Sequence, residues 1–196
     1  LKTKRATSMH DLMILGAGGH GRTLCEMAKL LGYSDIVFLD ENMPTSSASD
    51  SNLVIIGKIS ELQLHIKKAC NVVIGIGSNM VREQLYQQII SLGIQPVTLI
   101  HPLAFVSPSA TIADGAVVLA GSIVGANVRL GAGTIVNSHS TVDHDSILGD
   151  FAHLGVGVHL AGSADIGKSA FLQAGTVGGY NAKVDDYTVC PAGTIL

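Results

Sequence analysis

The stretch Leu130–His159 reads LGAGTI-VNSHST-VDHDSI-LGDFAH-LGVGVH, and it decides the fold. A branched apolar residue opens each six-residue unit, and a small residue follows four places later. Both registers extend over the chain from Ile100 to Val184, with Gly178 as the single exception in the first. A period of six belongs neither to an α-helix nor to an ordinary strand. It is typical of a parallel β-helix built from hexapeptide repeats.

Three such units make one eighteen-residue coil of a triangular prism. The branched residue fills the interior, and the small residue lets the chain turn a corner. Successive coils stack as parallel strands about 4.8 Å apart. The fifteen units that begin at Ile100 predict five coils, which is enough for a continuous core. Because five coils leave broad faces of the prism uncovered, we expect partner subunits to cover them.

The repeats begin near residue 100 of 196, which indicates two domains. We expect a flexible extension over residues 1–10, a Rossmann-like α/β domain over residues 11–97 and the β-helix over residues 98–196. The net charge is −3, and the twelve Lys and Arg residues are scattered. This distribution argues against binding to nucleic acid or to an anionic membrane.

No apolar stretch reaches the ~18–20 residues that span a bilayer, and no signal-peptide pattern follows the basic start. The three cysteines, Cys25, Cys70 and Cys190, are odd in number and widely spaced. They fit buried thiols in a reducing compartment better than a disulfide framework. We therefore expect a soluble, cytoplasmic protein.

The first part of the chain alternates short apolar runs with segments of helical period, which predicts a small doubly wound parallel sheet. A helix should follow the glycine-rich run after residue 15, and Pro44–Asn52 should be a solvated loop. The expected strands are Leu12–Leu15, Ile36–Leu39, Leu53–Ile56, Val72–Ile76 and Val97–Ile100, and the other expected helices are Glu61–Ala69 and Val81–Leu92 with Gly93 as the stop.

The turn at Gly16, Gly18 and Gly21 fits G-x-G-x-x-G, and Asp40 lies where a Rossmann domain places its ribose-binding acid. One βαβαβ half supplies a single mononucleotide site, so a nucleotide joined to a small group fits better than NAD. Amides near Gly19–Gly21 would hold the diphosphate, with His20 as a donor and Asp40-Glu41 reaching a base or sugar hydroxyl. The other interpretation is a turn that only packs a helix on a strand.

Five histidines lie in the repeats, and no two of them are eighteen residues apart, so they do not stack on consecutive coils. The spacing His139-x4-His144 resembles that of the γ-class carbonic anhydrases, which are trimeric hexapeptide prisms with zinc shared between subunits. Their third ligand position is occupied here by Leu103. A zinc-dependent lyase of that type is therefore one alternative function.

His144 follows the interior Val142 by two places and should point outward between Asp143 and Asp145. A neighbouring carboxylate orients an imidazole and raises its basicity. His153 lies nine residues later, which is half a coil, so the two rings should lie on different faces of one chain. They would meet only across a subunit boundary. The other interpretation gives each histidine a solvated or packing role.

Five short motifs follow one another along the chain: GAGGHG at residues 16–21, FLDE at 38–41, IHP at 100–102, TVDHD at 141–145 and FAH at 151–153. With these motifs in this order, the chain resembles the bacterial nucleotide-sugar acetyltransferases. This family includes UDP-4-amino-sugar N-acetyltransferases and sialic acid O-acetyltransferases. The resemblance covers residues 11–196. It implies a homotrimer of left-handed β-helices, with acetyl-CoA bound between adjacent prisms and the sugar nucleotide held by the N-terminal domain. No metal is expected.

The resemblance also implies the roles of individual residues. His144 would be the general base, Asp145 would take the place of the acid that polarises it, and the amide of Gly162 would hold the thioester oxyanion. The acetyl-CoA contacts would be His153, Ala174 and Ala192. The family's sequences usually continue beyond the point where Leu196 ends this one, so we expect part of the CoA site outside the sequence. The sugar-nucleotide contacts would be Gly18, Gly19, His20, Asp40 and Glu41.

The chemistry agrees with these residue types. A sugar amine is mostly protonated at neutral pH, and a hydroxyl is a weak nucleophile, so a base that titrates near 6.5 suits the attack on a thioester. No cysteine lies near His144 in the hexad register, which favours direct transfer over a covalent acyl-enzyme. Acetylation of an amine and of a hydroxyl remain alternatives, and so does a non-catalytic trimer that binds a sugar nucleotide.

Overall fold

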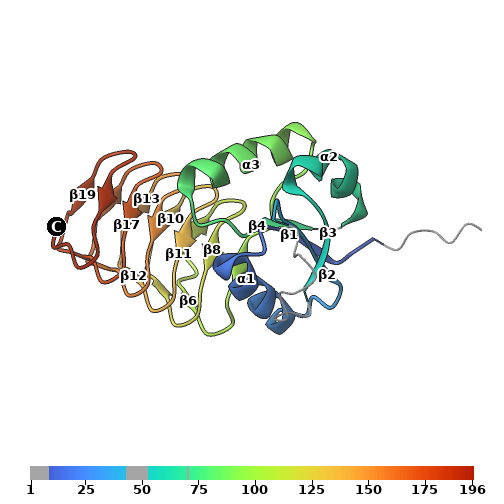
Figure 1. The fold of residues 1–196 in the computed structure, drawn as a ribbon. Coiled ribbons are helices and arrows are strands. Elements are labelled where there is room, and N and C mark those ends of the chain that lie inside the picture. The colour runs from blue at the N-terminus through green and yellow to red at the C-terminus, as the bar shows by residue number, and fades with distance from the viewer. Residues whose placement is uncertain (1–8, 43–52, 70) are drawn as a thin grey trace, which may run out of the picture. The chain divides into compact units, whose positions relative to one another are not determined.

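A computed structural model describes residues 9–42, 53–69 and 71–196 (Figure 1). The chain forms two compact units, Leu1–Ile76 and Gly77–Leu196. The second unit therefore contains the last helix of the α/β region as well as the β-helix. The expected domain boundaries stay a prediction. The predicted loop Pro44–Asn52 and most of the predicted extension over residues 1–10 lie outside the described residues.

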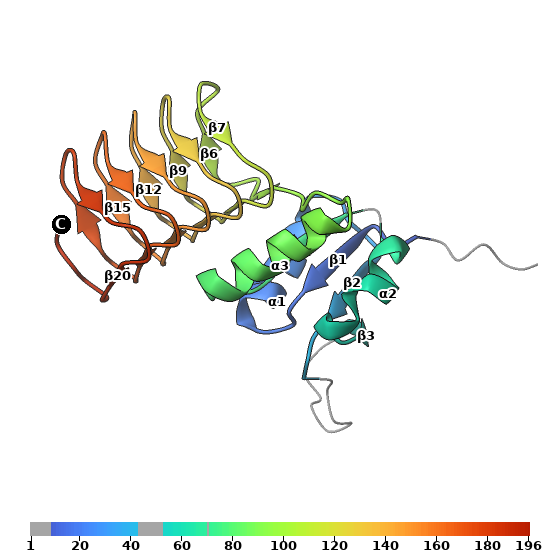
Figure 2. The same cartoon turned by 90° about the horizontal axis from the view of Figure 1, so that it is seen from above.

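The first unit is a parallel sheet with strand order β3-β2-β1-β4. Its strands β1, β2 and β4 are buried along their whole length, as in parallel sheets that carry helices on both faces. Figure 2 shows α1 and α2 on opposite sides of this sheet. The elements are β1 (Leu12–Leu15), α1 (Gly19–Leu30), β2 (Ile36–Leu39), β3 (Val54–Gly57), η1 (Ile59–Glu61), α2 (Leu62–His65), η2 (Ile66–Lys68) and β4 (Val72–Ile74).

The predicted α/β character of this unit is confirmed, with small differences in the elements. The third strand begins one residue later than expected, and the fourth ends two residues earlier. The predicted helix over Glu61–Ala69 is a short α-helix between two 3-10 turns. The carboxylate of Glu61 accepts the backbone N–H of Lys58 at 3.0 Å, which ties down the start of this segment three residues before Glu61.

The second unit begins with α3 (Asn79–Ser91) and continues as a left-handed β-helix of two-residue strands. Each of the strands β5 to β17 pairs in parallel with the strand eighteen residues further on, as Leu99 does with Val117. The strands are β5 (Leu99–Ile100), β6 (Phe105–Val106), β7 (Thr111–Ile112), β8 (Val117–Val118), β9 (Ile123–Val124), β10 (Arg129–Leu130), β11 (Ile135–Val136), β12 (Thr141–Val142), β13 (Ile147–Leu148), β14 (His153–Leu154), β15 (His159–Leu160), β16 (Asp165–Ile166), β17 (Phe171–Leu172), β18 (Val177–Gly178), β19 (Lys183–Val184) and β20 (Val189–Cys190).

These strands form the three faces of the prism. Face 1 contains β5, β8, β11, β14, β17 and β20; face 2 contains β6, β9, β12, β15 and β18; and face 3 contains β7, β10, β13, β16 and β19. Figure 2 shows the strands of face 2 aligned one per coil. The predicted coils of eighteen residues are therefore confirmed.

The second residue of each strand points into the prism and forms its core, as the hexad register predicted. Gly178 is the exception there, and its place is filled by neighbours. A Cβ atom at Gly178 would lie 2.8 Å from Leu160 Cδ2 and 3.7 Å from Leu196 Cδ1. The missing branched side chain is thus compensated from the coils on either side.

The corners use the left-handed backbone conformation, which non-glycine residues adopt only in turns of this kind. The non-glycine residues with positive φ are Asn127, His139, Asp145, Phe151, Ser163, Ser169, Asn181 and Tyr187. Most lie a whole number of coils apart. The small residues of the second hexad register follow them and are largely buried.

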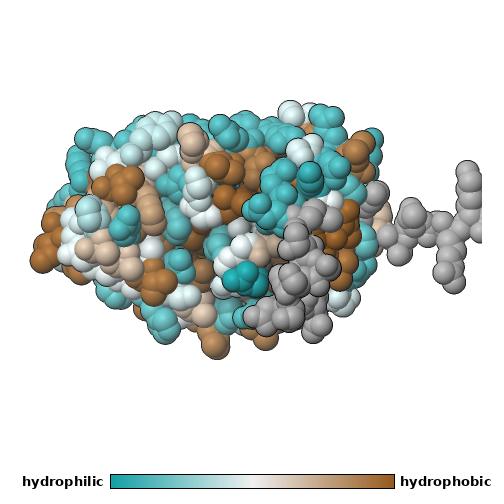
Figure 3. Space-filling model, in the orientation of Figure 1, coloured by the Kyte–Doolittle hydropathy of each residue, from teal (hydrophilic) through white to brown (hydrophobic). Residues whose placement is uncertain are grey.

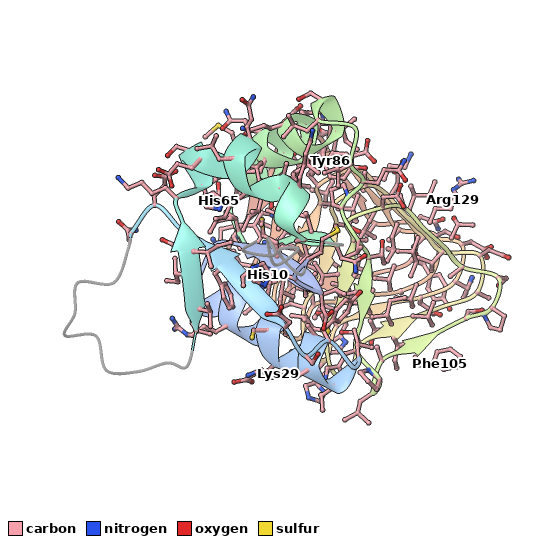
Figure 4. All side chains as sticks on the ribbon, turned by 90° about the vertical axis from the view of Figure 1, so that its right-hand side faces the viewer. His10, Lys29, His65, Tyr86, Phe105 and Arg129 are labelled. Carbon is pink, nitrogen blue, oxygen red and sulfur yellow. The ribbon has the colours of Figure 1, made fainter. Side chains whose placement is uncertain are left out.

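Helix α3 begins at Asn79, two residues before the predicted start at Val81, and ends at Ser91 before Gly93, whose φ is +76°. It packs against the corner that precedes face 1. There Tyr86 meets the edge of the Phe151 ring at 5.3 Å between centroids. Lys168 Nζ and Glu83 Oε1 form an ion pair at 2.6 Å in the same region. Figure 4 labels Tyr86 on this helix.

None of the helices among the described residues combines the length and the apolar character that a bilayer crossing requires.

Candidate functional site

His144 lies at the corner between β12 of face 2 and β13 of face 3, with 45% of its side chain exposed. Its Nδ1 is 2.8 Å from Asp145 Oδ2. Since a carboxylate accepts hydrogen bonds, Nδ1 carries the proton and Nε2 of the neutral ring keeps a lone pair. Asp143 Oδ1 accepts the backbone N–H of His144 at 2.8 Å. The predicted outward ring between two carboxylates is therefore present, and the short Asp145 side chain reaches it.

Asn127 completes this cluster, although no local sequence pattern points to it. Its Nδ2 donates to Asp145 Oδ1 at 3.0 Å, from a corner eighteen residues earlier. The one-coil offset between residues 127 and 145 is the signal that identifies this contact. Asn127 thus holds one carboxylate oxygen while the other faces the imidazole.

The charges of the cluster favour a basic imidazole. The hydrogen bond to Asp145 raises the pKa of His144, and the negative charges of Asp143 and Asp145 act in the same direction. The hydrogen bond from Asn127 and that from His144 lower the pKa of Asp145. Asp145 therefore stays ionised at neutral pH.

Gly162 lies one coil after His144, directly under the imidazole. A Cβ atom at residue 162 would lie 2.5 Å from His144 Cε1, so the ring packs where only glycine leaves room. Tyr180 follows one coil further, with its ring centroid 6.1 Å from that of His144. Within the described chain, the Gly162 N–H donates to no backbone carbonyl. The His144 site therefore has a candidate amide donor beside its base.

His153 lies on face 1, in β14, and is 8% exposed. Its Nδ1 is 3.2 Å from the carbonyl oxygen of Gly77, and its ring stacks on Phe171 with 4.5 Å between centroids and 22° between planes. Phe171 is the residue one coil further along face 1. This strand ladder and the Gly77 carbonyl fix the orientation of the ring.

A pocket of about 550 Å³ opens beside His153. Its wall is mostly apolar, with Phe171, Tyr187 and Val189 from the β-helix and Met80 from the first turn of α3. Ala174 and Ala192, the other expected donor contacts, lie exposed at the edge where the chain passes from face 1 to face 2. These two residues are one coil apart. His153, Ala174 and Ala192 therefore lie along one side of the prism.

One chain does not bring His144 and His153 together. His144 lies at the corner between faces 2 and 3, whereas His153 lies on face 1. Half a coil of backbone and the packed interior separate them, as the nine-residue spacing predicts. One chain therefore does not complete the expected site by itself.

The first unit brings Asp40 to the glycine-rich turn. The backbone N–H of Ala17 donates to Asp40 Oδ2 at 2.6 Å, between the ends of β1 and β2. The turn lies where the strand order reverses between β1 and β4, the usual ligand position in doubly wound sheets. Gly16 has a φ of +102°, and a Cβ atom on Gly21 would clash with the Gly16 carbonyl. Both glycines are therefore needed for the turn itself.

Gly18 and Gly19 are exposed, and nothing lies within 4 Å of a Cβ atom placed on either. Gly18 caps α1 without a side-chain hydrogen bond, and no acidic residue lies in the first turn, where His20 is half-buried. Glu41 turns away from the site, because its Oε1 accepts the backbone N–H of Ser60 at 2.6 Å. The structure thus brings Gly18, Gly19, His20 and Asp40 to one end of the sheet and directs Glu41 to η1.

In the parts of the chain that the structure describes, no group of three or more His, Cys, Asp or Glu side chains could hold a metal ion. His139, the partner of His144 in the carbonic-anhydrase spacing, is exposed at a left-handed corner beside Gly121.

Known proteins share both halves of this architecture. The sequence family "PglD N-terminal domain" matches residues 11–89. The acetyltransferase domain of PglB from Neisseria gonorrhoeae, solved in complex with acetyl coenzyme A, is 34% identical over 96% of each chain, with a TM-score of 0.78. A variant of perosamine N-acetyltransferase from Caulobacter crescentus, in complex with CoA and GDP-perosamine, is 27% identical over 96% of this chain and 89% of the other, with a TM-score of 0.89.

The WeeI protein from Acinetobacter baumannii shares the fold at 20% identity, with a TM-score of 0.66, over 93% of this chain and 94% of that one. The similarities therefore cover the α/β unit and the β-helix together, and not the repeats alone.

Proposed function

Because the chain belongs to the family of left-handed β-helix acetyltransferases that act on nucleotide-linked sugars, we propose that it transfers the acetyl group of acetyl-CoA to an amino group of such a sugar, or to a hydroxyl group of the sugar or of a sialic acid. His144 acts as the general base, and no covalent enzyme intermediate forms. The observation that carries this proposal is the Asp145–His144 hydrogen bond at 2.8 Å, which leaves Nε2 ready to accept a proton.

In the proposed reaction, the substrate nitrogen or oxygen attacks the thioester carbonyl carbon while His144 Nε2 takes its proton. The carbonyl oxygen becomes negative, and the Gly162 N–H beside the imidazole is the donor that would stabilise it. The carbon–sulfur bond then breaks, CoA leaves as the thiol, and the imidazolium supplies the proton. Asp145 stabilises the imidazolium in between, as its position 2.8 Å from Nδ1 allows.

We assign the donor to the side of the prism that carries His153, Ala174 and Ala192. The apolar pocket beside His153 would take the acetyl end of the donor, where exclusion of water protects the thioester. The exposed alanines along the edge would leave room for the narrow pantetheine chain.

The nucleotide part of the acceptor belongs at the amino end of α1. Uncapped N–H groups at a helix start attract a diphosphate, and the space around Gly18 and Gly19 is open. Asp40 holds the turn in shape through Ala17 and has one oxygen directed to Asn42 N–H at 2.8 Å. Glu41 can contact the sugar nucleotide only after it releases the backbone N–H of Ser60. We therefore assign the sugar-nucleotide contacts first to Gly18, Gly19, His20 and Asp40.

The proposed site also requires a homotrimer, since His144 of one chain must meet the donor side of the next. Face 2 is the candidate interface. Its outward residues include Phe105, Ile123 and Val177, which are 59%, 44% and 44% exposed. Face 3 carries Arg129, Asp165 and Lys183 at the corresponding positions. Figure 4 shows Phe105 and Arg129 projecting from different sides of the β-helix. Phe105 and Ile123 lie on adjacent coils, and exposed apolar surface of this kind marks an interface.

Activity measurements test the proposal directly. The purified protein is incubated with acetyl-CoA and a panel of UDP-, GDP-, dTDP- and CMP-linked sugars, and product mass and CoA release are recorded. We expect one acetyl group on one sugar of the panel. His144→Ala should lower kcat by about 10²-fold or more. His139→Ala, at an exposed histidine of the preceding corner in the same coil, is the matched control and should retain full activity. Full activity of His144→Ala would refute the assigned base.

A further inference from the structure

Arg82 is a cation buried at the start of α3, with 1% of its surface exposed. Burial lowers its pKa to about 9, so it remains charged at neutral pH. A buried charge is tolerated only when its donors are satisfied. Within the second unit, Nε donates to the Gly133 carbonyl at 2.7 Å, Nη2 to the Phe151 carbonyl at 2.6 Å, and Nη1 to the Gly77 carbonyl at 3.0 Å.

The acceptors on the β-helix form a ladder along one corner. Gly133, Phe151 and Ser169 are eighteen residues apart, and their φ angles are +60°, +60° and +54°. Arg82 binds the first two carbonyls, and Asn79 Nδ2 donates to the third at 2.8 Å. Asn79 Oδ1 in turn accepts from Arg82 Nη2 at 2.8 Å. Two side chains of α3 thus bind three successive coils at the same corner.

The same arginine reaches His153 through one backbone group. The Gly77 carbonyl that accepts from Arg82 Nη1 also lies 3.2 Å from His153 Nδ1. Because a carbonyl only accepts hydrogen bonds, Nδ1 of the neutral imidazole carries the proton. Stacking on Phe171 holds the plane of the ring. The tautomer and the orientation of His153 therefore depend on where the Gly77 carbonyl stands.

We propose that Arg82, supported by Asn79, is a positioning residue of the donor site: it fixes the Gly77 carbonyl, and that carbonyl sets the tautomer and orientation of His153. This inference rests on the proposed function, in which His153 contacts acetyl-CoA. Arg82 itself is not a catalytic residue, because its contacts in the β-helix unit are protein carbonyls and Asn79. Its effect reaches the donor pocket through His153.

A purely structural role would also fit the burial of Arg82. The test must therefore separate that role from the positioning of His153. The first experiment is a double-mutant cycle on the dissociation constant of acetyl-CoA, measured by calorimetry with wild type, Arg82→Lys, His153→Ala and the double variant. Lysine keeps the charge but loses the planar fork that reaches several carbonyls. We expect Arg82→Lys to weaken acetyl-CoA binding about tenfold, and the double variant to bind no more weakly than His153→Ala alone. The KM for the sugar nucleotide should stay unchanged.

Tyr86→Leu is the matched control, since Tyr86 docks the same helix on Phe151 one turn further along. It should lower the melting temperature and leave acetyl-CoA binding unchanged. Should Arg82→Lys fail to fold, Asn79→Ala enters the same cycle, because it removes the contacts to Arg82 and Ser169.

Two results would overturn the inference. In the first, Arg82→Lys weakens acetyl-CoA binding by the same factor whether His153 is present or replaced by alanine. In the second, Tyr86→Leu weakens acetyl-CoA binding as much as Arg82→Lys does. Absence of acetyl-CoA binding by the wild-type protein would instead refute the proposed function, so the two failures are distinguishable.

Discussion

At the scale of single residues, the proposed chemistry depends on how Asp145 is held. One oxygen receives Asn127 Nδ2, and the other faces His144 Nδ1. The Asp145 side chain is long enough for this contact, because the corner places it next to the ring in a left-handed conformation. The imidazole of the proposed base is therefore oriented from two consecutive coils of the β-helix.

The pH dependence of the reaction follows from this arrangement. Asp145 raises the pKa of His144, and a base must be neutral to act, so kcat/KM should fall as pH drops through that raised pKa. Asp145→Asn keeps a residue that tolerates positive φ but removes the charge. The acidic limb should then move to lower pH, and kcat should also fall because the tautomer is no longer fixed.

The measurement compares kcat/KM profiles of wild type and Asp145→Asn with the same substrate, whose own titration is common to both. An acidic limb at the same pH in both proteins would contradict the role given to Asp145.

The sequence pointed to the residues of the proposed chemistry more readily than to those that support them. His144, Asp145 and His153 stand out because they lie in the short motifs TVDHD and FAH. Asn127 and Tyr180 contribute from one and two coils away, and a search at eighteen-residue offsets would have found them. Arg82 could not be predicted in this way, since its carbonyl partners belong to corners whose contact with α3 is decided only by tertiary packing.

At the scale of elements, the hexad register describes the β-helix almost completely, and its one exception is informative. Gly178 stands where a branched residue is expected, yet Leu160 occupies the space. Packing across coils has replaced the local pattern there.

Gly178→Val, which restores the hexad pattern, should therefore destabilise the protein. A Cβ atom at residue 178 would lie 2.8 Å from Leu160 Cδ2, and overpacking of a core costs about 1–3 kcal/mol. Urea unfolding measures the loss in the free energy of unfolding. Leu160→Val should relieve the crowding, so the double variant should lose less than the sum of the two single variants. A stabilised Gly178→Val protein would show that the space is not filled.

The α/β elements were predicted less accurately at their ends than in their order. Helix α3 starts at Asn79, whose side chain also bonds to the corner carbonyls of Ser169 and Ala170. The segment after β3 divides into 3-10 and α turns over Ile59–Lys68. Neither boundary follows from helical periodicity, which reports the buried side of a helix and not the contacts that end it.

At the scale of the whole molecule, function depends on what covers the prism. Figure 3 shows apolar surface at the end of the β-helix where the sequence stops, and Ile195 and Leu196 are exposed in that coil. Face 2 carries the exposed apolar residues Phe105, Ile123 and Val177, while face 3 carries Arg129, Asp165 and Lys183 together with the half-buried Ile147. This asymmetry favours assembly through one particular face.

Charges on face 2 should dissociate the assembly. Ile123→Asp and Val177→Asp together place two carboxylates in the proposed interface, where burial without a partner is unfavourable. Sedimentation velocity should show a trimer for wild type and a monomer for the variant. Ile147→Asp makes the same change at the outward position of face 3 and should leave the trimer intact. A variant that remains trimeric with both face 2 charges would exclude this interface.

The most direct test of the account is complementation between two inactive variants, His144→Ala and His153→Ala. When the two proteins are mixed and reassembled in equal amounts, some boundaries pair an intact His144 of one chain with an intact His153 of its neighbour. Random assembly of a threefold ring makes about a quarter of the boundaries complete. We predict that the mixture recovers about that fraction of wild-type activity. A mixture as inactive as its two components, in trimers shown to contain both chains, would contradict a site shared between subunits.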